Sequence, residues 1–552
     1  MKKFLVIFLI LGILVAGGLF YLKQRKLRDF EPEIKQRLAR LVHDASKGLY
    51  KLEMERLEID LLKSKLTLVK AHLVPDSAMY ASLEKQEKAP NDLFDIYLDK
   101  LVIGDIDIAS LATNKNISLN RLFIDSPDVK VWHKKQSYNI KDDSSKTLYE
   151  QISKDIDKIK IDTILLRNVV FTYYNRKKND KKTRFENVNI VFTGMLVDST
   201  TQFDQNRFLF AEDCRISLKD YSIKTGNNLY LFSAGDLQIR TRDKAMDIKD
   251  ISLKPQFNNN EFYKRVKRQE DIFNISIASL RFDKVEWWSL LGEESFLSSK
   301  MKIADGRIKV YNDKTKRPGT EIKLGKFPHQ LLSKVPFNIE IDTIGVSNMD
   351  VSYEELNPKS LESGTIHFNN ITGNITNVTN NADLIKKDKN CIISVDALFL
   401  EETPLRAVFN FNLAAVKKGD FTLKATVGRI GHERLNKILI PLAMVKINSV
   451  NVKGVDLSIR GDNYNGSGTV KLLYDNLNIT ALKNDGDTLK KRGLLSFFAN
   501  NFVIYKSNPE KGDAPRVEKA VHKHNPQKSF FNLVWKTIFA GAANTVGFQP
   551  KQ

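Results

Sequence analysis

The chain has 552 residues, of which 42% are hydrophobic and 28% are charged, and its formal net charge at pH 7 is +21. This balance is typical of a folded protein and excludes wholesale disorder. The two cysteines, Cys214 and Cys391, are too few for a disulfide scaffold or a cysteine-rich metal site. We expect two separate buried thiols, and one long-range bridge is the alternative.

The N-terminus predicts a membrane anchor. Two lysines precede an uncharged apolar run from Phe4 to Leu22, and four basic residues follow it. A helix of this length spans about 28 Å, close to the ~30 Å hydrocarbon core of a bilayer. We expect an uncleaved anchor over residues 1–28; a cleaved signal peptide is the alternative. The apolar residues of the anchor include Phe4, Leu5, Phe8, Leu11, Leu14, Leu19, Phe20 and Leu22.

The charges around this run are nearly balanced, so they do not set its orientation. We expect a single-pass protein of the inner membrane with its body in the periplasm, because long domains translocate largely regardless of flanking charge. A body on the cytoplasmic side is the alternative. The positive net charge suits either nucleic acid or an anionic lipid surface. No nucleic-acid-binding motif accompanies the basic clusters, so we expect no nucleic-acid partner.

Apolar residues at spacings of three and four predict a connecting helix over residues 29–51. Beyond it, apolar and polar residues alternate in short runs, separated every eight to fourteen positions by turns that contain Asn, Asp or Gly. This rhythm is typical of antiparallel strands that follow one another in a meander. The expected fold is therefore mainly β.

The chain also repeats itself at an offset of 179 to 180 residues. Asp92–Ile96 returns as Asp271–Ile275, and Ile159–Ile164 returns as Ile339–Ile344. Chance can match one alternating strand with another, but it does not hold one register over about 80 residues. We interpret the pattern as two copies of one β unit. Further matches pair Val129 with Ile308, Val131 with Val310, and Asn168 with Asn348.

After the anchor and the connecting helix, five further segments are expected. They are a first β repeat over residues 52–230, a second over 231–389, a third β region with short helices over 390–506, a linker over 507–528 and an amphipathic helix over 529–552. The last helix carries an apolar stripe after a lysine-containing linker, which suits a helix lying on anionic lipid. A helix that caps the open end of the sheet explains the stripe equally well. The stripe contains Phe530, Phe531, Val534, Trp535, Ile538 and Phe539.

Strands stacked edge to edge at ~4.8 Å would form an elongated sheet that coils or curls. If one apolar face is left open, this sheet offers a trough for the acyl chains of lipids. The alternative is that alternating apolar residues form the closed core of a β sandwich. The candidate lining residues are Ile96, Leu98, Ile159, Ile161, Ile275, Ile277, Ile339 and Ile341.

Three segments, Leu57–Leu68, Ile124–Val131 around Pro127, and Gly466–Leu477, resemble strands of the AsmA-like superfamily of Gram-negative envelopes, which includes AsmA and TamB. The resemblance covers most of the chain in pattern, through short and degenerate motifs. It implies an inner-membrane anchor, a periplasmic β-taco body with an apolar groove, and a role in moving phospholipid toward the outer membrane.

Motifs of covalent chemistry are missing from the sequence. It has no phosphate-cradling glycine loop, and Ser467 lacks the glycine two positions earlier that a nucleophile elbow requires. His432 lacks the second histidine of a zinc protease, and His522 and His524 lie in the expected linker. We therefore expect no enzyme, no cofactor and no metal site.

The leading hypothesis is an envelope lipid-transfer or outer-membrane-maintenance protein. Its expected partners are the inner membrane, phospholipid acyl chains and other envelope or outer-membrane proteins. A non-catalytic scaffold or regulator of an envelope assembly machine is the main alternative. A secreted adhesin is a third hypothesis, and it requires cleavage near Gly18.

Overall fold

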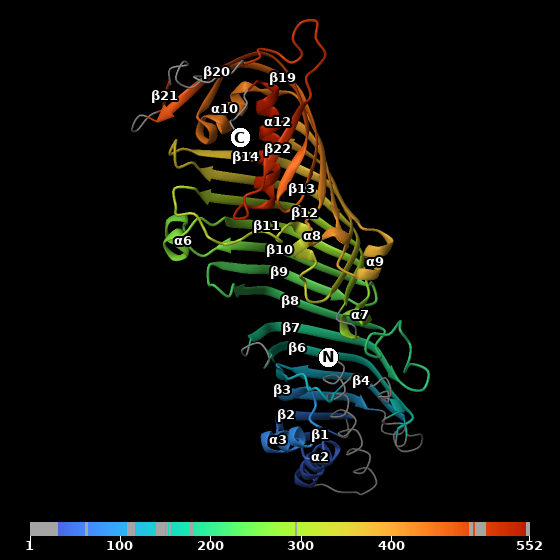
Figure 1. The fold of residues 1–552 in the computed structure, drawn as a ribbon. Helices are drawn as coiled ribbons and strands as arrows, with labels where there is room; N and C mark the ends of the chain where they lie inside the picture. Colours follow the sequence, from blue (N-terminus) through green and yellow to red (C-terminus); the bar gives the residue numbers. More distant parts are fainter. Residues whose placement is uncertain are drawn as a thin grey trace. The chain divides into compact units, whose positions relative to one another are not determined.

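The computed structural model describes residues 31–60, 64–106, 116–139, 149–150, 153, 156–175, 181–292, 295–484, 489–491 and 504–547. Strand makes up 58% of the structure, helices are few and the strands form a long mixed sheet, so the mainly β, repetitive fold is confirmed (Figure 1). The predicted anchor lies outside the described residues. Among the residues that are described, no helix is long and apolar enough to cross a membrane.

The chain divides into two compact units. The first unit contains Met1–Tyr221 and Gly235–Asp247, and the second contains Ser222–Ala234 and Ile248–Gln552. The elements of the first unit are α2 (Glu31–Ala45), β1 (Tyr50–Asp60), β2 (Lys65–Pro75), α3 (Ser77–Lys85), β3 (Asp92–Ile106), β4 (Asn116–Asp125), β5 (Asp128–His133), β6 (Lys158–Asn175), β7 (Lys181–Val197) and most of β8 (Asp213–Lys224), which ends in the second unit.

In the first unit, β1, β2 and β3 pair in sequence order as antiparallel strands. Strands β4 and β5 each pair with β3 on one side and with β6 on the other. The pairs with β6 are parallel, so the sheet is mixed, whereas the sequence predicted antiparallel strands in a meander. The 24 residues between β5 and β6 provide the long crossover that a parallel pair requires. Strands β7 and β8 then continue the sheet in antiparallel order.

The remaining elements are β9 (Tyr230–Arg240) and β10 (Ala245–Pro255), which each have residues in both units, and those of the second unit. The latter are α6 (Asn259–Val266), β11 (Ile272–Val285), α7 (Trp287–Gly292), β12 (Ser295–Asp313), α8 (Pro328–Leu332), β13 (Asn338–Leu356), β14 (Ser363–Thr379), α9 (Ala382–Lys387), β15 (Asn390–Phe399), β16 (Thr403–Asn412), the 3₁₀ helix η1 (Leu413–Ala415), β17 (Phe421–Val427), β18 (Ile430–Gly431), α10 (His432–Ala443), β19 (Val445–Gly461), β20 (Asn465–Asn484), β21 (Leu489–Lys491), β22 (Glu518–Lys523) and α12 (Phe530–Thr545).

The second unit repeats the pairing of the first. Strand β11 pairs antiparallel with β12, β12 pairs parallel with β13, and β14 and β15 continue in antiparallel order. The crossover between β12 and β13 again has 24 residues. Even single residue pairs recur, since Ile96 lies opposite Val129 as Ile275 lies opposite Ile308. The repeat seen in the sequence is therefore a repeat of register as well as of pattern.

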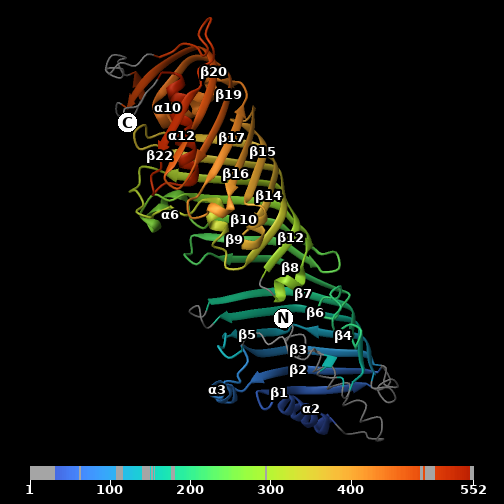
Figure 2. The same cartoon turned by 45° about the vertical axis from the view of Figure 1, so that its right-hand side comes forward.

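Beyond β15, the strands β16, β17, β19, β20 and β22 pair in that order, all antiparallel. Strand β22 lies within the stretch 507–528 that we expected to be a linker, so that expectation is wrong for Glu518–Lys523. Its alternation is short and rich in charged residues, which hides it in the sequence. Helices α10 and α12 lie against these strands (Figure 2).

Asparagine residues in the left-handed conformation mark the irregular points of the strands. Asn168 has a φ of 54° in β6, and its counterpart Asn348 has a φ of 49° in β13. At both positions the register with the next strand shifts, as in a β-bulge. Asparagine tolerates this backbone conformation better than most residues, which explains why the repeat retains it here.

Substitution of Asn348 should show how much this conformation matters. The Asn348 amide Nδ2 donates a hydrogen bond to Asp305 Oδ1 at 2.6 Å, and both Asn348→Val and Asn348→Gly remove that bond. Only valine has the Cβ that opposes a positive φ. We expect the free energy of unfolding of Asn348→Val to be about 1–2 kcal/mol lower than that of Asn348→Gly. Denaturant titration of both variants measures this difference, and equal stabilities would contradict it.

Candidate functional site

Two neighbouring rows of apolar side chains cross β11 to β14, and we call them the apolar strip. Period-two alternation places both rows on one face of the sheet, because residues two apart in a strand point to the same side. Cross-strand pairing connects the members of each row. The first row is Ile275, Ile308, Val351 and Phe368, and the second is Phe273, Val310, Tyr353 and Ile366.

The row between these two is polar and lies on the opposite face. It consists of Asn274, Lys309, Ser352 and His367, which pair across the same strands. On this face Arg307 also forms an ion pair with Asp350 at 3.6 Å. At these rows the sheet is therefore amphipathic, with the apolar strip on one face and a polar row on the other.

The apolar strip is only partly covered by protein. Every one of its side chains is at least partly exposed, and Phe273 is 38% exposed. The counterparts in the first unit are buried, since Ile96 is 2% and Val129 is 0% exposed. Two copies of one sequence pattern thus differ in how completely the chain covers their apolar face.

The predicted lining residues divide in the same way. Those of the first repeat, Ile96, Leu98, Ile159 and Ile161, are all buried and belong to the core of the first unit. In the second repeat, Ile275, Ile277 and Ile339 are partly exposed and Ile341 is buried. The expectation that all eight line an open face is therefore wrong for five of them. Alternation identifies the apolar face of a strand, but it does not show what packs on that face.

The difference between the copies predicts different responses to truncation. We expect Ile96→Ala to lower local stability by about 2–4 kcal/mol, because it leaves a cavity in a closed core. We expect Ile275→Ala to cost below about 1 kcal/mol, because less surface returns to water. Amide hydrogen exchange of β3 and β11, read by mass spectrometry, measures both effects. Equal losses of protection would mean that the two faces are equally covered.

Further along the sheet, the C-terminal helix closes one face. Phe411, Phe421 and Leu423 of β16 and β17 form one buried cluster with Phe530 and Leu533 of α12. The Phe421 and Phe530 rings meet edge to face with their centroids 4.8 Å apart. The sheet is thus covered by α12 in this region and partly open along the apolar strip.

The crossover between β12 and β13 contributes to the same cluster. Phe327, just before α8, is fully buried and meets Phe530 with centroids 5.0 Å apart. Gln330 of α8 donates a hydrogen bond from Nε2 to the carbonyl oxygen of Val416 at 2.7 Å. The crossover therefore packs against the C-terminal helix and the sheet together.

His329 is buried in this region beside Phe411, and neither ring nitrogen has a hydrogen-bond partner. Burial lowers the pKa of His329 from its ordinary value to about 4. The charged form is disfavoured because an imidazolium would lose its hydration without gaining a partner. The folded protein therefore holds this histidine neutral.

A pH dependence of stability follows. Between pH 6.5 and about 4, unfolded His329 binds a proton that folded His329 does not, so wild-type stability falls as the pH is lowered through this window. We expect His329→Phe to remove this loss, with an advantage over wild type that is small above pH 7 and grows toward pH 4. Denaturant titrations of both proteins across this range test it, and a constant difference would contradict the assignment.

The two cysteines are free and buried, as expected. Burial raises the pKa of Cys214 to about 12 and that of Cys391 to about 11, so neither thiol is activated as a nucleophile.

His524, expected in a solvated linker, is buried instead. Its Nδ1 lies 2.7 Å from the carbonyl oxygen of Asn463, and Nε2 lies 3.2 Å from that of Lys528.

The predicted stripe of the C-terminal helix is divided between two faces of α12. Phe530 and Val534 are buried, and Ile538 packs against the same cluster. Phe531, Trp535 and Phe539 are exposed. The helix therefore packs on the sheet and also presents an aromatic face to solvent. The sequence could not separate these roles, because adjacent positions of one broad stripe belong to both.

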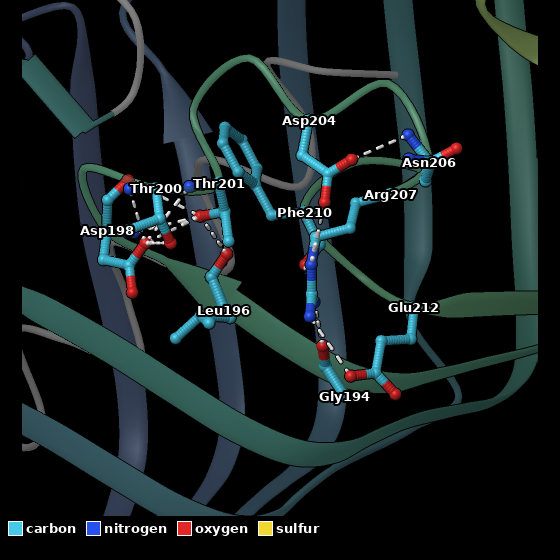
Figure 3. Close-up of polar contacts among 10 residues, drawn as sticks. All are labelled: Gly194, Leu196, Asp198, Thr200, Thr201, Asp204, Asn206, Arg207, Phe210 and Glu212. Carbon is cyan, nitrogen blue, oxygen red and sulfur yellow. Dashed lines mark hydrogen bonds and ion pairs between the residues drawn. The ribbon is translucent and has the colours of Figure 1, made fainter.

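One loop that the sequence did not single out is held by many polar contacts. Between β7 and β8, Asp198 accepts hydrogen bonds from the backbone and hydroxyl of Thr200, and the Arg207 guanidinium donates to the carbonyl oxygen of Gly194 at 2.7 Å (Figure 3). Burial acts to raise the pKa of Asp198, but these hydrogen bonds lower it. The contacts fix the shape of the loop, whose Phe203 is 73% exposed.

Among the residues that the structure describes, no group of three or more His, Cys, Asp or Glu side chains could hold a metal ion. The chain matches no known family model and no curated protein. Its geometry and exposure make the apolar strip the candidate site.

Proposed function

We propose that the apolar strip binds the acyl chains of phospholipid and that the protein is an envelope lipid-transfer or outer-membrane-maintenance protein. In this proposal residues 1–28 anchor the chain in the inner membrane and the body lies in the periplasm. The observation that carries the proposal is the partial exposure of eight apolar side chains on one face of four adjacent strands.

Acyl chains suit this surface for an energetic reason. A chain of about 15 methylenes costs on the order of 12 kcal/mol to expose to water, so its transfer requires a continuous apolar contact. The strip is apolar from β11 to β14 and carries one hydroxyl, that of Tyr353, which donates a hydrogen bond to Glu355 Oε2 at 2.9 Å. The pKa of this phenol is raised, mainly by burial and further by the nearby Glu355 carboxylate.

Two further features support the proposal. The net charge of +21 favours contact with anionic headgroups. The strand segments that resemble the AsmA-like superfamily imply the same architecture, with an anchor in the inner membrane and a β-taco body. No covalent chemistry is part of the proposed activity.

A non-catalytic scaffold of an envelope assembly machine is the second candidate. The closed core of the first unit favours it, because Ile96 and Val129 are covered by the protein and offer no surface to a lipid. A scaffold would bind protein partners through its surface and would carry no lipid on the apolar strip.

Photocrosslinking at the strip tests the proposal directly. A benzophenone amino acid at position 275 should crosslink to phospholipid in cells, whereas the same group at position 274, on the polar face, should not. In parallel, Ile275→Asp should lower the phospholipid that co-purifies with the protein by about tenfold, because a carboxylate is expensive to place beside hydrocarbon. Mass spectrometry of the extracted lipids gives both readouts.

Asn274→Asp is the matched control, since it adds the same charge one residue away on the opposite face. It should retain lipid at the wild-type level. Equal lipid content in all three proteins, together with no crosslink at position 275, would exclude the strip as a lipid site. Crosslinks from position 275 to a protein would instead support the scaffold.

A further inference from the structure

The orientation of α12 is fixed by tight packing along one side. Leu533 and Thr537 are fully buried against β20, where Gly466 leaves no space for a larger residue. Gly541 likewise lies so close to Val470 that an added Cβ would come within 2.5 Å of its side chain. Because this side of the helix is packed tightly against the sheet, the opposite side faces outward.

That outward side is aromatic. Phe531 is 68% exposed, Trp535 is 37% exposed and Phe539 is 38% exposed. They lie four residues apart, so they align along one face of the helix. Lys536 is exposed beside them, with its Nζ 5.9 Å from the centre of the Phe539 ring. A row of exposed aromatic side chains of this kind is typical of an interaction surface.

The charge of the region indicates what covers it. Residues 517–547 contain four lysines and one acid, Glu518, which gives this segment a net charge of +3. The helix itself contains no acidic residue. Aromatic side chains flanked by lysines are typical of helices at the surface of anionic bilayers, where the rings enter the interface and the ammonium groups meet headgroups.

We propose that the aromatic face of α12, formed by Phe531, Trp535 and Phe539, docks on an anionic phospholipid bilayer. The structure favours a bilayer over a protein groove because the lysines complement a negative surface. This inference goes beyond the proposed function, since it holds whether or not the apolar strip carries lipid.

Fluorescence of Trp535 in the full chain tests the contact. Four tryptophans are present and none lies in residues 1–30, so insertion of the predicted anchor does not itself place a tryptophan in the bilayer. The protein is reconstituted into vesicles of brominated phosphatidylcholine, with or without brominated phosphatidylglycerol. The fluorescence that is missing from Trp535→Phe is the emission of Trp535. We expect that emission to be quenched only when phosphatidylglycerol is present.

The variant Phe531→Ser/Phe539→Ser keeps the reporter and removes its aromatic neighbours. We expect the lipid concentration needed for half-maximal quenching to rise about tenfold or more. The matched control is Phe203→Ser/Leu361→Ser, which removes two exposed apolar side chains elsewhere and should bind as wild type does. Thermal unfolding of each variant checks that the fold is retained.

Three results would overturn the proposal. An unquenched Trp535 in anionic vesicles would assign the aromatic face to a protein partner or to a second copy of the chain. Equal quenching with and without phosphatidylglycerol would exclude an anionic surface as the target. Unchanged quenching in a folded Phe531→Ser/Phe539→Ser variant would mean that the aromatic face makes no contact with the bilayer.

Discussion

The structure depends on one constraint. An alternating strand places its apolar side chains on a single face, and exposing that face to water is energetically unfavourable. A face of this kind is stable only when something covers it. The first repeat buries Ile96 and Val129, and in the second unit α12 inserts Phe530 and Leu533 against the later strands. On β11 to β14 of the second unit the apolar strip remains partly exposed, and the proposed function rests on this exposure.

The two repeats keep the same backbone features although different parts of the chain cover their apolar faces. Asn168 and Asn348 occupy the same left-handed position, and both crossovers to a parallel strand have the same length. These features set the register of the sheet, which does not depend on what packs against its face. Ile275 and Ile96 therefore have equivalent cross-strand partners, Ile308 and Val129, although Ile275 is partly exposed and Ile96 is buried.

The C-terminal region combines a structural and an exposed role in one helix. Small residues such as Gly541 let α12 approach β20 closely, and this contact orients Trp535 outward. The crossover residue Phe327 joins the same cluster, so segments far apart in the sequence stabilise one another. A helix held in this way can present an exposed aromatic face without itself moving.

The sequence by itself determined the mainly β class and the two-copy repeat, because alternation and offset depend on local order alone. It missed the parallel pairs and β22, since strand direction and pairing partner depend on where a long connection returns. Only the tertiary structure decided that Ile96 is core and Ile275 is partly exposed, and that Phe530 packs inward while Phe531 faces solvent. The physical reason is that burial depends on distant segments, whereas periodicity records only the side of the strand or helix to which a residue points.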